Sequence, residues 1–155
     1  ALIDNFTNAF GEIFDNSIHK ITNIIQEGKL TIGGIDFEIK QTAEAFDIAI
    51  PEINAVYTHM LGHDCHSIVA GTDHAEGIIA ELNGYIEKDY DLILTSHYTP
   101  EDLKDAQTKI NYIENLKKIA DSCADADSFK KEVQKQYPEY SGHNYLDMTA
   151  GFFYA

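Results

Sequence analysis

The chain has 155 residues, of which 44% are hydrophobic, so it is long enough to form a single domain, spanning 1–155, around a buried core. Its 11 basic and 26 acidic residues give a formal net charge of −15, which argues against nucleic acids and anionic membranes as partners. No apolar run approaches the roughly 18 residues that span a bilayer, so we expect a soluble protein, cytoplasmic or periplasmic.

The first half of the chain predicts one helix followed by a β-meander. Apolar residues recur at helical spacing over 2–16, and 18–25 has the composition of a strand. Gly33-Gly34 is a two-residue hairpin signal, and the residues after it alternate between apolar and charged, which is typical of a strand with one buried face. The expected strands of the meander cover 30–32, 35–39, 46–50 and 55–60.

The second half of the chain is mostly helical. Thr72 caps an expected helix that ends near residue 88, and a short buried strand follows at 91–95. A capping hydroxyl, a proline and two acids begin a helix at 99–120, and a weaker helix is expected at 128–137. The apolar tail is expected to pack on the body. This order predicts the α/β (α+β) class, with a mixed or antiparallel meander sheet that carries helices on one face.

Candidate metal ligands are concentrated in the segment that follows the last strand of the meander. Residues 59–66 contain five groups that can bind a metal ion, namely His59, His63, Asp64, Cys65 and His66. Zinc favours imidazole nitrogen, thiolate sulfur and carboxylate oxygen. A His-rich polar loop without metal is the alternative, because the spacing matches no strict zinc signature.

His97 is the other candidate, because it follows the strand 91–95 and precedes a capped helix. The C-terminal ends of strands are where α/β folds place their sites. On sequence alone, His97 is equally a ligand and a residue that hydrogen-bonds the turn backbone. Tyr57 and Tyr98 flank the histidines, and we expect them to line a ligand pocket together with these imidazoles.

Three stretches of the chain resemble the second half of the metallo-β-lactamase superfamily. The run 28–42 is similar to a hairpin that leads in that family to a threonine-rich turn, and the run 50–59 to a strand–turn–strand unit that ends in a metal ligand. Asp91-Leu-Ile-Leu-Thr-Ser-His97, followed by a helix, looks like the family's last ligand motif. The resemblance covers about residues 20–120, and 121–155 is expected to form a helical tail.

The resemblance implies a metal-dependent hydrolase with zinc as its cofactor, iron or no metal being the alternatives, and a small molecule as its substrate. It implies His97 and His59 as leading ligands, with His63, Asp64 and His66 as second choices and Cys65 as a ligand in its thiolate form. The family's H-x-H-x-D-H motif has no counterpart here, and Thr42-Ala43-Glu44-Ala45 lacks the histidine of the family's threonine-proline-glycine-histidine motif. We therefore expect an incomplete or weakened metal site.

The resemblance also implies half of an αββα sandwich, in which two sheets pack face to face. A half-fold exposes one apolar sheet face, so we expect a homodimer, or an N-terminal half that covers this face. The start at Ala1 rather than Met favours a truncated chain. A non-catalytic half-fold that dimerises or binds a ligand is the alternative function. Cys65 and Cys123 permit one disulfide bond or two free thiols.

Overall fold

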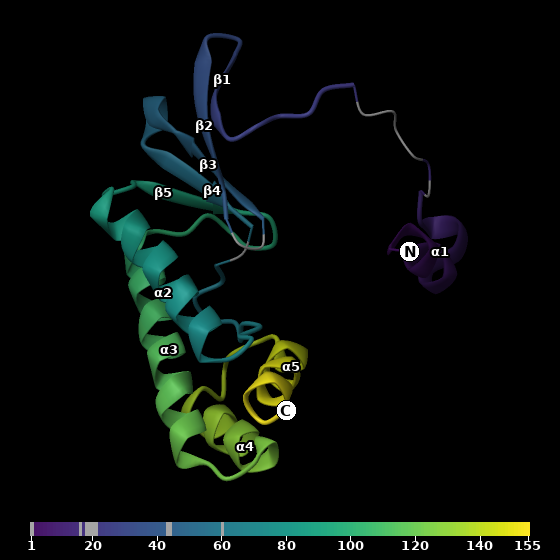
Figure 1. Ribbon diagram of the computed structural model, residues 1–155, viewed down its shortest axis with the longest axis vertical. Coiled ribbons are helices and arrows are strands. Elements are labelled where there is room, and N and C mark those ends of the chain that lie inside the picture. The colour runs from purple at the N-terminus through teal and green to yellow at the C-terminus, as the bar shows by residue number, and fades with distance from the viewer. Residues whose placement is uncertain (1, 16, 18–21, 43–44, 60) are drawn as a thin grey trace.

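A computed structural model describes residues 2–15, 17, 22–42, 45–59 and 61–155. A five-stranded sheet carries helices on one face, and the C-terminal helices extend away from it (Figure 1). The strands are β1 (Gly28–Ile32), β2 (Ile35–Gln41), β3 (Phe46–Ile50), β4 (Ala55–Thr58) and β5 (Leu92–Thr95). The helices are α1 (Leu2–Phe10), α2 (Thr72–Glu87), α3 (Leu103–Ser122), α4 (Ala126–Gln136) and α5 (His143–Phe153), with 3-10 turns at Gly11–Ile13 and Pro51–Ile53. None of these helices is long and apolar enough to cross a membrane.

The sheet is mixed and has the order β1-β2-β3-β4-β5. The first three neighbouring pairs are antiparallel and joined by short connections, whereas β5 lies parallel to β4. Parallel neighbours need a crossover connection, and α2 lies within it. The predicted fold class, a mixed meander sheet with helices, is confirmed.

Several predicted elements differ from the structure. Helix α3 begins at Leu103 with Asp102 as its capping residue, not at 99, and Gly71 rather than Thr72 precedes α2. Residues 22–26 have no regular structure, so the predicted strand is wrong there, and 18–21 lie outside the described residues. The predicted helix over 2–16 ends at Phe10, because Gly11 has a φ of 57°, which an α-helix does not continue through. Figure 1 shows α1 apart from the sheet and from the other helices.

The buried residues form one cluster against the sheet and another among the helices. Val56 and Ile93 of the sheet are buried with Leu82 of α2 and Ile110 of α3. The second cluster joins the far ends of α2 and α3 to the C-terminal helices, and its members include Leu116, Phe129, Val133, Leu146 and Ala150. The helical tail therefore shares a core with α3, which also carries the sheet.

The other face of the sheet is apolar, and no described helix packs on it (Figure 1). Strand register places one apolar row across this face, consisting of Ile39, Ile48, Tyr57 and Leu94. Ile32, Ile35 and Phe46 extend the same face and are 58%, 46% and 48% exposed. We call this surface the open sheet face.

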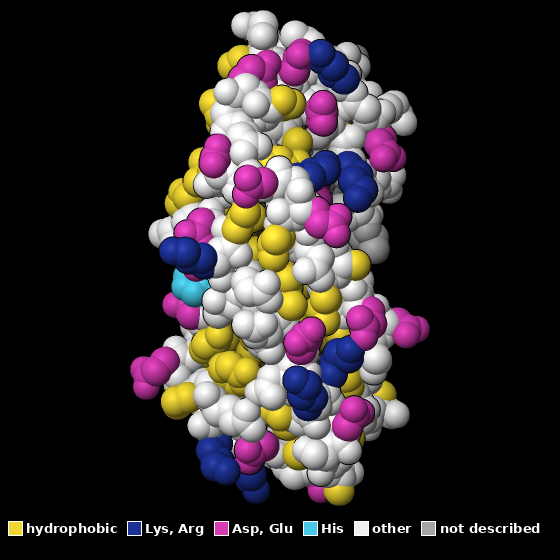
Figure 2. All heavy atoms as spheres, turned by 90° about the vertical axis from the view of Figure 1, so that its left-hand side faces the viewer, with side chains coloured by type: hydrophobic (Ala, Val, Ile, Leu, Met, Phe, Trp, Pro, Cys, Tyr) yellow, Lys and Arg dark blue, Asp and Glu magenta, His cyan; other side chains and the backbone are white. Residues whose placement is uncertain are grey.

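The opposite side of the molecule, which carries α2 and α3, is highly charged. Figure 2 shows acidic and lysine side chains intermixed over this side, with apolar side chains between them. Lys117 of α3 and Glu76 of α2, for example, form an ion pair that joins the two helices. Charges of both signs alternate there, so this side offers no continuous surface of a single charge.

Gly142 occupies a position where a side chain does not fit. It precedes α5 with a φ of 78°, and a Cβ atom there would lie 2.7 Å from Sγ of Cys65 and 3.2 Å from the carbonyl oxygen of His66. We expect Gly142→Ala to destabilise the protein by about 2 kcal/mol, because it adds backbone strain to a close contact. Gly77→Ala inside α2, where nothing lies within 4 Å of the new atom, should instead stabilise it by about 0.5–1 kcal/mol. Urea denaturation measures both effects, and losses of equal size would contradict the packing at Gly142.

Candidate metal centre

The carboxyl ends of β4 and β5 bring two predicted ligands together. Thr58 pairs with Thr95 in the parallel register, so the residues that follow leave the sheet side by side. The ring centroids of His59 and His97 are 5.1 Å apart, and the ring planes are nearly perpendicular at 80°. The amide of Ser96 donates to the carbonyl oxygen of His59 at 3.2 Å, which links the two segments. Both imidazoles are exposed.

A buried carboxylate, that of Glu101, fixes the loop after His59. The side chain of Glu101 is 1% exposed, and its backbone exchanges two hydrogen bonds of 2.9 Å with Ile93 of β5. Its carboxylate accepts from the amides of Gly62 at 3.0 Å and His63 at 2.8 Å. A third contact of 2.8 Å joins it to Nδ1 of His63 and raises the pKa of this imidazole above 6.5. Glu101 therefore sets both the path of the loop and the orientation of the ring.

An open hollow of about 630 Å³ lies beside this loop. It is lined by His63, Asp64, Ser96, His97, Tyr98 and Thr99. The ring of Tyr98 packs edge-on against that of His63, with 6.0 Å between centroids. Three of the predicted ligands, His63, Asp64 and His97, thus border the same space. His59 contacts the ring of His97 but lines a separate cavity of about 160 Å³.

The imidazoles of His59 and His97 are at a spacing that two zinc ligands can adopt. Two imidazoles on one tetrahedral zinc ion have ring centroids about 5 Å apart, because Zn–N bonds are about 2 Å long. The 5.1 Å between His59 and His97 agrees with this value. Within the described part of the chain, one group places three donor atoms within 4.8 Å of one another, namely His63, Glu101 and Asp105. The Glu101 oxygens already accept three hydrogen bonds, so this group is satisfied without a metal ion.

His66 lies in the interior, away from the hollow. It is 1% exposed, and its Nδ1 is 2.8 Å from the hydroxyl of Tyr112. Burial, with nearby positive charge, lowers the pKa of His66 from 6.5 to about 4, so the ring is neutral at pH 7. Its buried Nε2 has no partner among the described residues. His66, Thr95 and His97 help to line a cavity of about 20 Å³, which has room for one water molecule.

The remaining predicted site residues do not converge on the hollow. Cys65 and Cys123 are free thiols, and Sγ of Cys65 donates to the carbonyl oxygen of His66 at 3.3 Å. Tyr57 lies on the open sheet face, and its hydroxyl hydrogen-bonds Ser96. Tyr98 lines the hollow whereas Tyr57 does not, so the structure does not place the two tyrosines in one pocket.

Lys109 of α3 is a buried cation that sequence reasoning missed. It is 2% exposed, and its Nζ donates to the carbonyl oxygen of Cys65 at 2.5 Å and to Oγ of Ser67 at 2.9 Å. Burial lowers the pKa of Lys109 from 10.5 to about 8. The available signal was its place three residues after Ala106 and four before Ile113, on the buried face of the helix. Through these two hydrogen bonds, Lys109 connects α3 to the loop that carries the candidate ligands.

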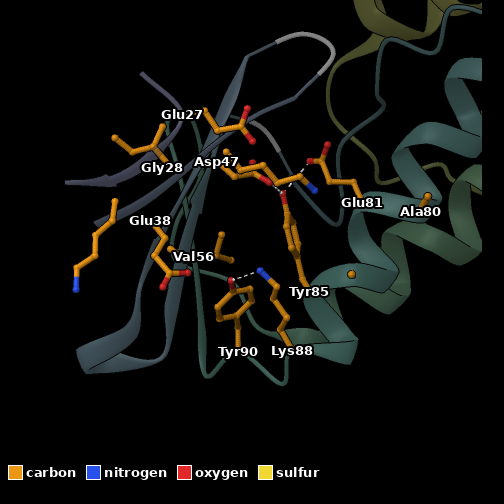
Figure 3. Close-up of a pocket in the computed structure, with 15 residues that line it drawn as sticks. Glu27, Gly28, Glu38, Asp47, Val56, Ala80, Glu81, Tyr85, Lys88 and Tyr90 are labelled. Atoms are coloured by element: carbon orange, nitrogen blue, oxygen red, sulfur yellow. Dashed lines mark hydrogen bonds between the residues drawn. The ribbon is translucent and has the colours of Figure 1, made fainter. Parts of the chain in front are cut away.

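A second polar cluster lies between the sheet and α2, in a cavity of about 460 Å³ (Figure 3). The hydroxyl of Tyr85 lies 2.9 Å from Oδ2 of Asp47 and 2.8 Å from Oε1 of Glu81. A hydroxyl has one proton to donate, so the two carboxyl groups share it. Burial raises the pKa of both Asp47 and Glu81, which favours the protonated carboxyl.

This cluster is expected to stabilise the fold in acid and to lose that contribution as pH rises. The folded-state pKa values of Asp47 and Glu81 lie above 3.8 and 4.5, the ordinary values for these groups. Asp47→Asn removes one titrating group, so the stability of this variant relative to wild type should improve as pH rises above the ordinary carboxyl range. Urea denaturation at stepped pH measures this trend. Glu114→Gln, at an exposed position of α3, is the control, and its stability relative to wild type should not change with pH. If the relative stability of Asp47→Asn also stayed constant with pH, the expectation would be refuted.

No protein-family model and no curated protein matches the chain. Among solved structures, it is similar to the stereoselective inverting sec-alkylsulfatase Pisa1 from Pseudomonas sp., with 16% identity and a TM-score of 0.58 over 84% of this chain and 25% of the alkylsulfatase. The chain has part of a metallo-β-lactamase fold. A metallo-β-lactamase from Pontibacter korlensis is also matched, with 15% identity and a TM-score of 0.44 over 59% of this chain and 47% of that protein.

The metallo-β-lactamase resemblance is confirmed at the level of the fold. At 16% identity the likeness establishes architecture and not activity. The chain spans about a quarter of the length of the alkylsulfatase, at 25%.

Proposed function

We propose that this chain supplies one half of the metal centre of a zinc-dependent hydrolase of the metallo-β-lactamase type. The observation that carries the proposal is the pair of exposed imidazoles, His59 and His97, at the ends of adjacent parallel strands and 5.1 Å apart. His63 and Asp64 line the same hollow as His97 and are the proposed additional ligands. Imidazole and carboxylate groups are the donors that catalytic zinc sites use.

Zinc bound at the hollow would act as a Lewis acid and lower the pKa of a bound water. The chain's own residues would hold the ion and border the space for a small-molecule substrate, with Ser96 and Tyr98 on its wall. The ligands of the family's first motif are absent from this sequence. We therefore expect this chain to bind zinc without catalysing efficient hydrolysis by itself.

Zinc binding to the isolated chain tests the proposal. Native mass spectrometry and competition with a chromogenic chelator should give one zinc ion per chain for wild type. His59→Gln and His97→Gln should each weaken binding by at least tenfold, because each removes a ligand. His143→Gln, at the exposed first residue of α5, is the matched control and should bind as wild type does. Absence of zinc and iron binding by wild type would overturn the proposal and favour the non-catalytic half-fold.

We also propose that a second αβ layer covers the open sheet face in the native protein. Ile32, Ile35 and Phe46 are each about half exposed there, and large apolar patches of this kind mark interfaces. Another part of the polypeptide or a second copy of this chain would supply the cover. If light scattering gives a dimer, a second copy of the chain supplies the cover. A monomer that binds a hydrophobic dye indicates that another part of the polypeptide supplies it. A dye-free monomer would contradict both.

A further inference from the structure

We infer that Glu101 is a positioning residue, which fixes the tautomer of His63 so that Nε2 is the nitrogen offered to a ligand in the hollow. The identity of that ligand, a zinc ion, rests on the proposed function. The tautomer itself does not depend on metal binding. No pattern in the sequence assigns this role to Glu101.

The hydrogen-bond geometry determines which nitrogen carries the proton. An ionised carboxylate only accepts hydrogen bonds, so the 2.8 Å contact between Glu101 Oε1 and His63 Nδ1 requires the proton on Nδ1. Oδ1 of Asp105 lies 3.4 Å from the same nitrogen and reinforces this preference. A neutral imidazole protonated at Nδ1 has its lone pair on Nε2. Nε2 makes no hydrogen bond to any residue in the described part of the chain.

Glu101 is itself held too firmly to follow a rotation of the ring. Its backbone pairs with Ile93 of β5, and its two carboxylate oxygens accept from the amides of Gly62 and His63. Since its side chain is 1% exposed, water does not readily replace a lost donor. His63, by contrast, is 35% exposed and lines the hollow beside His97. A buried carboxylate behind a half-exposed imidazole is the arrangement that orients histidine ligands in metal sites.

Loop anchoring alone is the competing explanation for Glu101, and a double-mutant cycle separates the two roles. Zinc affinity is measured by chelator competition for wild type, Glu101→Gln, His63→Gln and the double variant. Glu101→Gln should weaken binding by about 10–100-fold in the wild-type background. It should change affinity little when His63 is already glutamine, because no ring remains to be oriented. The same loss in both backgrounds would show an anchoring role and overturn the inference.

The tautomer can also be measured directly on the zinc-free wild-type protein. Nitrogen-15 NMR, at a pH where the ring is neutral, should show His63 protonated at Nδ1, and His74 or His143 provides an internal comparison. A proton on Nε2 would overturn the inference. Failure of the proposed function has a different signature, namely no zinc binding by wild type, which leaves the NMR result unaffected.

Discussion

Replacing Phe129 with alanine is expected to destabilise the protein by about 3–5 kcal/mol. Phe129 is fully buried, and its ring lies 5.8 Å from that of Phe153 and 5.9 Å from that of Tyr154, so it joins α4 to the end of α5. For a domain of this size the loss corresponds to a fall in Tm of roughly 10 °C. Thermal and urea denaturation measure it.

Phe152→Ala is the matched control for this substitution. Phe152 is 50% exposed on α5, so its truncation should cost less than about 1 kcal/mol. Losses of the same size at both positions would contradict the packing of α4 on α5. The packing also bears on the candidate metal centre, because Ser141 before α5 hydrogen-bonds the amide of His66 at 2.9 Å and the carbonyl oxygen of Asp64 at 3.2 Å.

Glu101→Ala is expected to destabilise the protein by about 3 kcal/mol, because it leaves two inward-facing amides without an acceptor. These are the amides of Gly62 and His63, which donate hydrogen bonds to the Glu101 carboxylate at 3.0 and 2.8 Å. Hydrogen exchange of the 61–66 loop should accelerate in the variant, since the loop loses its attachment to β5.

Glu114→Ala provides the reference for this second substitution. Glu114 is exposed on α3, so its loss should change stability by no more than about 0.5 kcal/mol. If Glu101→Ala were equally mild, the buried carboxylate would not be what holds the loop. Denaturant titration of the two variants under the same conditions makes the comparison.

Local patterns were sufficient to predict most of the sheet. Gly33-Gly34 and the alternation that follows it predict the β1–β2 hairpin, and short buried runs predict β3, β4 and β5. The segment 22–26 misled because isoleucines suggest a strand, but a strand forms only where a neighbouring strand supplies hydrogen bonds. Such partners are a property of the whole fold and leave no local signal.

The candidate site was predictable only in part. The resemblance implied His59 and His97 as ligands, and the structure places their rings 5.1 Å apart, after two strands whose parallel pairing the sequence had not predicted. Glu101 and Lys109 were missed, since the sequence suggested a helix-dipole acid and an ordinary helix lysine. Their roles depend on the path of the 61–66 loop over α3, which no local pattern records.

The most direct test of the metal centre is X-ray diffraction from crystals of this chain grown with zinc, with data collected on both sides of the zinc absorption edge. We predict an anomalous peak bonded at about 2 Å to an imidazole nitrogen of both His59 and His97. Crystals saturated with zinc that show no peak at these two histidines, or that show their rings turned apart into solvent, would contradict the account.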